Sequence, residues 1–210
     1  ELQALQTGTR RPVNLNFFCH TPPKPDAARE AAWRSLLAPF YDEAGLDLAS
    51  VPVGAGRVPF SHAIADLIAP FRPPILSFHF GLPAPDLLAR VKAWGAVVLS
   101  SATTVAEARW LVAHGADAII AQGLEAGGHR GIFITDDIST QMGTLALLPQ
   151  VVAAVDVPVI AAGGIADAAG VAAAMALGAA GVQVGTAYLC SDEATTSALH
   201  RAALHSEAAA

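Results

Sequence analysis

Short apolar runs alternate with helical stretches along most of this chain, and this alternation restricts the possible folds more than any other feature. Each run has the length and apolar content of a buried strand, and such runs are typical of parallel sheets covered by helices. Six strands are predicted: PVNLNFF from Pro12, ILSFHF from Ile75, AVVLS from Ala96, DAIIAQ from Asp117, PVIAAG from Pro158 and GVQVGT from Gly181. The sequence therefore predicts an α/β fold built on a parallel sheet.

The connections between these runs are predicted to be helical. Three of them end near glycine, as helices often do: PAPDLLARVKAWG, TTVAEARWLVAHG and DAAGVAAAMALGA. The first connection is longer, over about residues 19–74, and we expect helices within it at about 26–43 and 61–71. Its Pro and Gly residues mark a long helical insertion rather than a second domain. We therefore treat residues 1–210 as one domain.

Side chains alternate in character along the first two predicted strands. Apolar residues fall on one face and polar residues on the other: Val13, Leu15, Phe17, Leu76, Phe78 and Phe80 against Asn14, Asn16, Ser77 and His79. In a doubly wound sheet both faces meet helices, so a polar face would be costly. In a barrel the inner face near the carboxyl ends of the strands can line a site. The pattern favours a (β/α)8 TIM-barrel type of fold.

Glycine turns follow the last two predicted strands. Gly163 and Gly164 open a helix, and the final strand ends in Gly185 and Thr186. Paired turns of this kind let backbone N–H groups approach a phosphate, and in barrels that site typically follows strands seven and eight. The six strands would then be strands three to eight, and the first two would be missing. Either the sequence is a fragment or another segment completes the sheet, because an open parallel barrel would leave strand edges unpaired.

Composition and charge exclude several classes of partner. The formal net charge is −6, with no cluster of Lys and Arg, which argues against nucleic acid. The 24 uncharged residues from Ala168 to Ser191 change from helix-like to strand-like, so we expect a buried helix–strand pair rather than a membrane span. Cys19 and Cys190 are expected to be free thiols in a cytoplasmic protein. No HxxxH or CxxC spacing occurs, so no metal is expected.

Three segments resemble the nitronate monooxygenases, formerly called 2-nitropropane dioxygenases: VNLNFFCH, IAQGLEAGGHRG and PVIAAGGIADAAGVAAAMALGAAGVQVGT. The resemblance covers essentially the whole chain. It implies an FMN-bound barrel that oxidises alkyl nitronates with molecular oxygen, giving a carbonyl compound and nitrite. It also implies that the family's first strand lies upstream of Glu1.

The resemblance assigns roles to individual positions. Residues that match flavin-contacting positions of the family are Asn14, Ser101, Gln122, Gly128, Gly163, Gly164, Gly185 and Thr186. Ser101 stands where some members have lysine, and Gln122 where some have aspartate. His129 matches the family's active-site histidine. The implied partners are a nitronate or nitroalkane and oxygen, and a homo-oligomer is compatible with the sequence.

The chemistry of an imidazole suits this role. A nitronate carries negative charge on its nitro oxygens, so His129 can orient it as an N–H donor. For a neutral nitroalkane, a neutral His129 can remove the α-proton as a general base. Arg130 beside it is either an anion contact or an exposed loop residue. His79, on the polar face, is expected either to line the substrate pocket or to be a hydrogen-bonded core histidine.

Two other functions remain open from the sequence. Flavin-dependent enoyl-acyl-carrier-protein reductases have a similar glycine–histidine loop but accept electrons from a reduced nicotinamide. The chain could also be a flavin-free, non-catalytic remnant. FMN is expected rather than FAD, because the glycine turns suit one terminal phosphate and no GxGxxG fingerprint is present.

Overall fold

A computed structural model describes residues 2–51 and 56–207 of the chain. It divides into two compact units. The larger unit comprises Glu1–His20 and Phe60–Ala210, and the smaller comprises Thr21–Pro59. Each unit is described by itself below.

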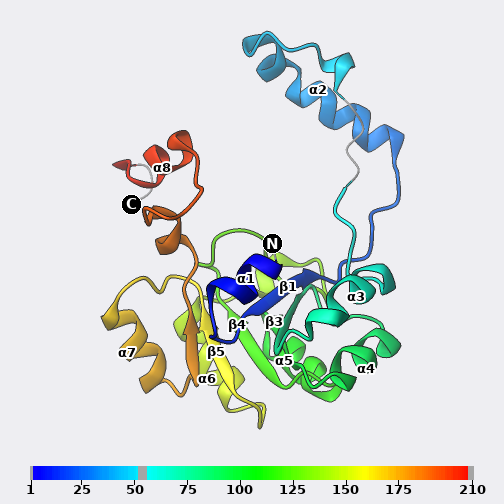
Figure 1. Cartoon of the computed structure of the whole chain (residues 1–210). Helices are drawn as coiled ribbons and strands as arrows, with labels where there is room; N and C mark the ends of the chain where they lie inside the picture. The colour runs from blue at the N-terminus through cyan, green and yellow to red at the C-terminus, as the bar shows by residue number, and fades with distance from the viewer. Residues whose placement is uncertain (1, 52–55, 208–210) are drawn as a thin grey trace. The chain divides into compact units, whose positions relative to one another are not determined.

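A six-stranded parallel sheet forms the centre of the larger unit (Figure 1). Its strands are β1 (Asn14–Phe18), β2 (Ile75–His79), β3 (Val97–Ala102), β4 (Ala118–Gln122), β5 (Val159–Ala162) and β6 (Gly181–Gln183). Neighbours in the sheet are neighbours in sequence, as in a barrel. All six predicted strands are confirmed. The sheet is curled into part of a barrel, and within the described residues β1 and β6 each pair on one side only.

Helices follow the strands in the order expected for repeated strand–helix units. They are α1 (Leu2–Gly8), α3 (His62–Ile68), α4 (Pro85–Ala93), α5 (Val105–Ala113), α6 (Thr144–Val152), α7 (Ala168–Ala176) and α8 (Ala198–Leu204). Short 3-10 turns lie at Ala69–Phe71 (η2), Ile138–Thr140 (η3) and Thr186–Cys190 (η4). The uncharged segment from Ala168 is α7 followed by β6, so the predicted helix–strand order is confirmed, but the predicted burial is not: only Ala174 of α7 is buried, and β6 is partly exposed. No helix in the described part of the chain is long and apolar enough to cross a membrane.

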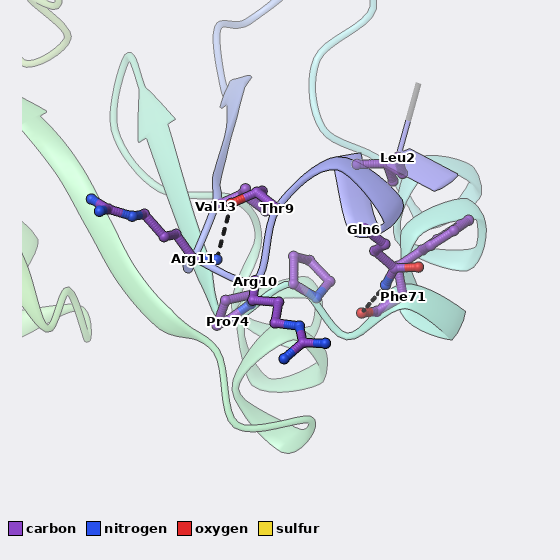
Figure 2. A pocket seen from close by; sticks show the side chains of 9 residues that line it. Leu2, Gln6, Thr9, Arg10, Arg11, Val13, Phe71 and Pro74 are labelled. Carbon is purple, nitrogen blue, oxygen red and sulfur yellow. Dashed lines mark hydrogen bonds between the residues drawn. The ribbon is translucent and has the colours of Figure 1, made fainter. Parts of the chain in front are cut away.

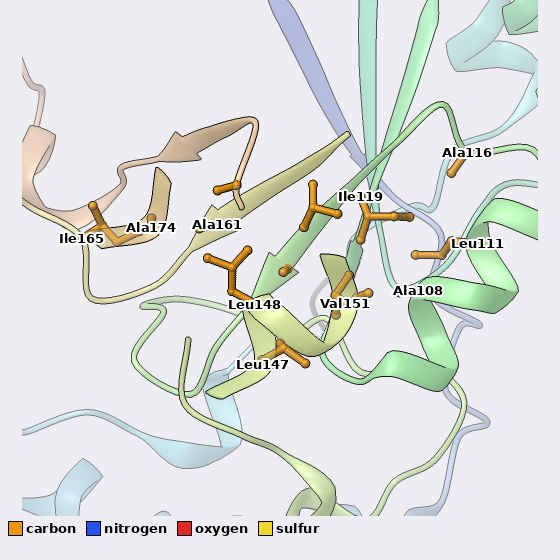
Figure 3. Packing of buried hydrophobic residues seen from close by; sticks show 14 residues of the cluster. Ala108, Leu111, Ala116, Ile119, Leu147, Leu148, Val151, Ala161, Ile165 and Ala174 are labelled. Carbon is orange, nitrogen blue, oxygen red and sulfur yellow. The ribbon is translucent and has the colours of Figure 1, made fainter. Parts of the chain in front are cut away.

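Helix α6 was not predicted. Its sequence, TLALLPQVV, contains Pro149, which lacks the N–H that an interior helical position donates and usually ends a helix. Burial of Leu147, Leu148 and Val151 against the sheet accounts for the helix nonetheless (Figure 3). Tertiary packing therefore outweighs the local preference here.

Two apolar clusters cover the outer face of the sheet. One joins β4 and β5 to α5, α6 and α7 through residues such as Leu111, Ile119 and Ala161 (Figure 3). The other joins β2 and β3 to α3 and α4, with Leu76, Phe78 and Val98 fully buried. The predicted apolar face of β2 is thus the outer, helix-covered face, which leaves the polar face on the inside.

Phe80 departs from the predicted alternation. It was expected to lie with Leu76 and Phe78 on the apolar face, but the strand ends at His79 and Phe80 has a φ of 67°. The ring lies instead beside Phe18, His79 and His129. Alternation holds only while the backbone stays extended, and the left-handed turn breaks it.

The smaller unit consists of α2 (Ala27–Glu43) and η1 (Leu48–Ser50). Asp26 caps α2 by accepting hydrogen bonds from the N–H groups of Ala28 and Arg29. Arg34 pairs with Glu30 at 2.9 Å and donates to the carbonyl of Leu48 at 3.2 Å. The helix predicted at 26–43 is therefore confirmed, whereas the segment predicted helical at 61–71 belongs to the larger unit as α3 and η2.

Candidate functional site

One hollow of the larger unit lies at the amino ends of the strands, and another lies over the inner face of the sheet. The first, of about 170 Å³, lies where α1 leads into β1, and its lining includes Gln6, Arg10, Val13 and Pro74 (Figure 2). These residues precede β1 and β2, so this hollow is at the amino ends of the strands. None of the predicted site residues lines it. Active sites of barrels form at the other end.

The second hollow, of about 430 Å³, lies over the polar inner face of the sheet. Its lining is Asn14, Asn16, Phe18, Ser77, His79, Ser101, Ile120, Gln122, His129, Ala162 and Gln183. Five predicted site residues are therefore brought together: Asn14, His79, Ser101, Gln122 and His129. The other five lie in the connections after β4, β5 and β6: Gly128, Gly163, Gly164, Gly185 and Thr186.

Hydrogen bonds order the polar side chains of the first two strands. The amide of Asn14 donates to the Ser77 hydroxyl at 2.9 Å, and Ser77 donates to the Asn16 side-chain oxygen at 2.8 Å. These two hydrogen bonds connect β1 to β2. Neither uses the side-chain oxygen of Asn14, which is therefore available to a ligand in the hollow. The two bonds fix the direction of the Asn14 amide, which at this site would otherwise be free to flip.

Gln122, at the end of β4, holds the loop that carries His129. Its amide nitrogen donates to the carbonyl of His129 at 2.9 Å, and its oxygen accepts from the N–H of Gly131 at 2.7 Å. The Gln122 side chain thus binds the backbone of the loop at two points, the carbonyl of His129 and the N–H of Gly131. A Cβ at Gly131 would lie 2.9 Å from His79 Cε1 and 3.0 Å from the Gln122 oxygen, so glycine allows this close approach.

His79 supports the same carbonyl from the neighbouring strand. Its Nε2 lies 3.1 Å from the His129 carbonyl oxygen, and its Nδ1 lies 3.0 Å from Ser101 Oγ. A carbonyl can only accept, so Nε2 carries the proton and Nδ1 of the neutral ring accepts from the Ser101 hydroxyl. Burial lowers the pKa of His79 below its ordinary value of 6.5, which favours this neutral form. His79 therefore lines the hollow and is also a hydrogen-bonded core residue.

Arg130 binds the backbone rather than pointing freely into solvent. Its guanidinium donates to the carbonyls of Gly123 at 2.6 Å and Leu124 at 2.8 Å. Both of these carbonyls belong to the first turn after β4. Arg130 thus closes the loop upon itself, and these bonds account for the residue without an anion.

Glu125 and Glu107 anchor the rest of this connection. Glu125 accepts from the N–H and the hydroxyl of Thr144, both at 2.8 Å. Burial raises the pKa of Glu125, but its hydrogen bonds with its own backbone and with Thr144, together with the Arg130 charge, bring it below 4.5. Glu107 of α5 is fully buried and accepts from the N–H groups of Phe133 and Ile134 at 2.7 and 3.3 Å.

The imidazole of His129 is held differently from its backbone. The side chain is exposed at the mouth of the hollow and packs edge-on against Phe18, with ring centroids 5.0 Å apart. Within residues 2–51 and 56–207, neither ring nitrogen forms a hydrogen bond. Both nitrogens are therefore available to a substrate, while the carbonyl of the same residue is fixed by Gln122 and His79.

The glycine turns after β5 and β6 contain backbone N–H groups that could bind a phosphate. The N–H groups of Gly164 and Gly185 donate no hydrogen bond within the described part of the chain, and they follow the neighbouring strands β5 and β6. Unpaired donors of this kind are suited to an anionic oxygen. The unpaired N–H groups and the polar hollow therefore suit a ligand that carries a terminal phosphate.

Some lining residues were not predicted as site residues. Phe18 and Asn16 follow Asn14 at intervals of two, so strand alternation could have found them. Gln183 is a polar residue in an otherwise small, apolar strand, which is also a signal. No cluster of three potential metal ligands occurs among the residues that the structure describes.

The family profile for nitronate monooxygenase matches residues 1–210. The chain is 45% identical over 206 residues to the nitronate monooxygenase of Paraburkholderia phytofirmans, covering 96% of this chain and 55% of that protein. It is 43% identical to the nitronate monooxygenase of Pseudomonas aeruginosa, covering 96% and 58%. The chain belongs to the nitronate monooxygenase family.

The structural comparison agrees with this membership. The crystal structure of nitroalkane oxidase from Streptomyces ansochromogenes superposes with a TM-score of 0.85 at 36% identity, over 99% of this chain and 59% of that one. The chain spans little more than half the length of these relatives.

Proposed function

We propose that the protein is an FMN-dependent nitronate monooxygenase that oxidises alkyl nitronates with molecular oxygen to a carbonyl compound and nitrite. Nitroalkanes are the second candidate substrate class. One observation carries the proposal: at the mouth of a polar hollow, His129 presents two ring nitrogens that form no hydrogen bond within the described residues, on a loop held by Gln122 and His79. Bound flavin would accept electrons from the substrate and pass them to oxygen.

The side chains of this chain have separate tasks in that reaction. His129 meets the nitro group, donating an N–H to its anionic oxygens, or takes the α-proton from a neutral nitroalkane at an unprotonated ring nitrogen. Gln122 and His79 keep the loop at a fixed distance from the sheet. Phe18 forms an apolar wall of the hollow beside the imidazole.

Several finer features belong to the same proposal. We place the six strands as strands three to eight of a closed (β/α)8 barrel, in which two further strands complete the sheet. This is supported by the strand order and by the share of the relatives that the chain spans. We also place the protein in the cytoplasm as a homo-oligomer, and cell fractionation with size-exclusion chromatography would test both.

Substitution of His129 tests the proposed reaction in the full-length protein. General-base assistance contributes about 10²–10⁴-fold, so His129→Ala should slow anaerobic flavin reduction by neutral nitroalkanes by that factor. Nitronates need no proton abstraction and should lose less. The flavin content should stay near that of the wild type, because backbone N–H groups and not the imidazole would hold the phosphate.

The matched control is His114→Ala, which removes a histidine of α5 that stacks on Trp110 outside the hollow. It should leave both rates unchanged. Equal slowing of both substrates by His129→Ala would make the residue an orienting donor and not a base. If neither rate changed, the proposed role of His129 would be wrong.

The cofactor and the electron donor have their own tests. Heat-released cofactor should have the mass of FMN, and recovery of FAD would overturn that assignment. Rapid anaerobic bleaching of the flavin by NADH or NADPH would favour the reductase alternative, and a colourless full-length protein would favour a non-catalytic remnant.

A further inference from the structure

We infer that Phe80 is a positioning residue, whose ring keeps the imidazole of His129 in the orientation that the reaction requires. The inference rests on the proposed function, in which His129 meets the substrate. The His129 ring has no hydrogen-bonding partner in the described part of the chain, so its orientation depends on packing. The two assignments are separable, because orientation can be measured without turnover.

The backbone of Phe80 is in a conformation that bulky residues rarely adopt. Its φ is 67°, and only one other non-glycine residue in the described part of the chain, Arg72, has a positive φ. A Cβ in the left-handed region crowds the following carbonyl, so the conformation costs free energy unless surrounding contacts impose it. Residues with such backbone conformations cluster at functional sites.

Contacts on both sides of the turn impose this conformation. Ser100 of β3 is fully buried, and its hydroxyl lies 3.1 Å from the carbonyl of Phe78 and 2.9 Å from that of Gly81. The Ser100 hydroxyl thus contacts a carbonyl on each side of Phe80 in the turn. Gly81 has a φ of 90°, and a Cβ there would lie 3.3 Å from the ring of Phe133.

This turn carries the Phe80 ring to the inner side of the sheet. Residues 76 and 78 face the helices, so an extended residue 80 would face them too. Instead the Phe80 ring lies 4.6 Å from that of His79 and 5.2 Å from that of Phe18, measured between centroids. The strained turn therefore changes the face on which the ring lies.

There the ring joins an aromatic group around His129. The Phe80 and His129 centroids are 6.0 Å apart at an interplanar angle of 87°, and Phe18 contacts His129 at 5.0 Å and 61°. Edge-to-face contacts at these distances are favourable and depend on orientation. Since no hydrogen bond within the described residues fixes the His129 ring, these contacts are what restrict its rotation.

The test uses the full-length, flavin-loaded protein with Phe80→Leu and Phe80→Gly. Both variants remove the ring, but glycine also removes the backbone strain. In protein labelled with ¹³C-histidine, both should move the ring C–H resonance of His129, which is assigned by its loss in His129→Ala. Both should lower kcat for a nitronate by about 10- to 100-fold, the cost of a small misplacement of a reacting group. Phe80→Gly should melt no lower than Phe80→Leu.

Trp94→Leu is the matched control. Trp94 caps the C-terminus of α4, packs against the apolar cluster on the outer face of the sheet and donates its indole N–H to the carbonyl of Pro73 at 3.3 Å. Its replacement should leave the His129 resonance and kcat as in the wild type. This control separates loss of the Phe80 ring from a general effect of removing an aromatic residue.

Two results would overturn the inference. One is an unchanged His129 resonance in both Phe80 variants. The other is a wild-type kcat in Phe80→Gly alongside a reduced kcat in Phe80→Leu, because the ring would then be dispensable. If the wild-type protein does not oxidise nitronates, the proposed function fails, and the His129 resonance alone decides whether Phe80 positions the imidazole.

Discussion

Replacement of Glu107 by glutamine should lower the free energy of unfolding by about 2–4 kcal/mol. One carboxylate oxygen accepts from the N–H and the hydroxyl of Thr103, both at 2.7 Å, and the other from Phe133 and Ile134. An amide can accept on one side only. In the more favourable orientation, the glutamine oxygen accepts from Phe133 and Ile134, and its NH2 group faces Thr103. The Thr103 hydroxyl can rotate and accept from this NH2 group, but the Thr103 N–H then has no acceptor.

The magnitude follows from these contacts. A hydrogen bond to a charged group contributes about 1.5–3 kcal/mol, and leaving a buried donor unsatisfied costs about 1–3 kcal/mol. Loss of one charged acceptor, together with weaker bonds to Phe133 and Ile134, gives the expected range. The relief of burying a neutral group in place of an ionised one acts in the opposite direction, so the sum stays below the simple total.

Urea unfolding of the full-length protein measures this difference. Hydrogen exchange at the amides of Phe133 and Ile134 should also speed up, since these are the bonds that weaken. Asp66→Asn is the matched control, because it removes a carboxylate that pairs with Arg90 on the surface and should change stability by at most about 1 kcal/mol. A Glu107→Gln stability equal to that of the wild type would refute the argument.

Two further predictions concern pH and the glycine turns. Because burial lowers the pKa of His79 below 6.5, the unfolded chain binds a proton that the folded chain does not, so stability should fall as pH decreases below about 6.5. Urea melts of His79→Gln should show a shallower fall, and an unchanged slope would exclude His79 as the cause. Gly163→Ala should destabilise the fold, since its φ is 118° and a Cβ would lie 2.9 Å from the N–H nitrogen of Ala126. Gly185→Ala should keep the wild-type melting temperature but bind flavin more weakly, as titration of the apoprotein would show.

Much of the fold follows from local sequence pattern. The six strands and the helices α2, α3, α4, α5 and α7 were predicted because apolar periodicity and helix-ending glycines are properties of short segments. The polar inner face was predicted for the same reason, from alternation along β1 and β2. Helix α6 was not predicted because Pro149 disfavours a helix locally, whereas the packing against the sheet that stabilises α6 is not visible in the local sequence.

The contacts that order the site could not be read from local pattern. Gln122 and His79 meet at one carbonyl although they are 43 positions apart, and Ser101 reaches His79 from a third strand. Glu107 lies in an apolar helix face, where a carboxylate is a signal of a buried partner but does not name it. Phe80 was placed on the wrong face because its turn depends on a hydrogen bond from Ser100, which lies on another strand.

The glycines of the predicted phosphate site differ in whether the fold itself requires a glycine. Gly163 and Gly164 have positive φ angles and lie against Ala126 and Glu125, so the fold itself requires glycine at both positions. Gly185 has a φ of −115°, and a Cβ there would meet nothing within 4 Å. Neither backbone conformation nor packing within the described residues explains a glycine at 185. Its N–H has no partner within the described residues and follows the strand next to β5, which supports the proposed role of Gly185 in holding the phosphate of the flavin.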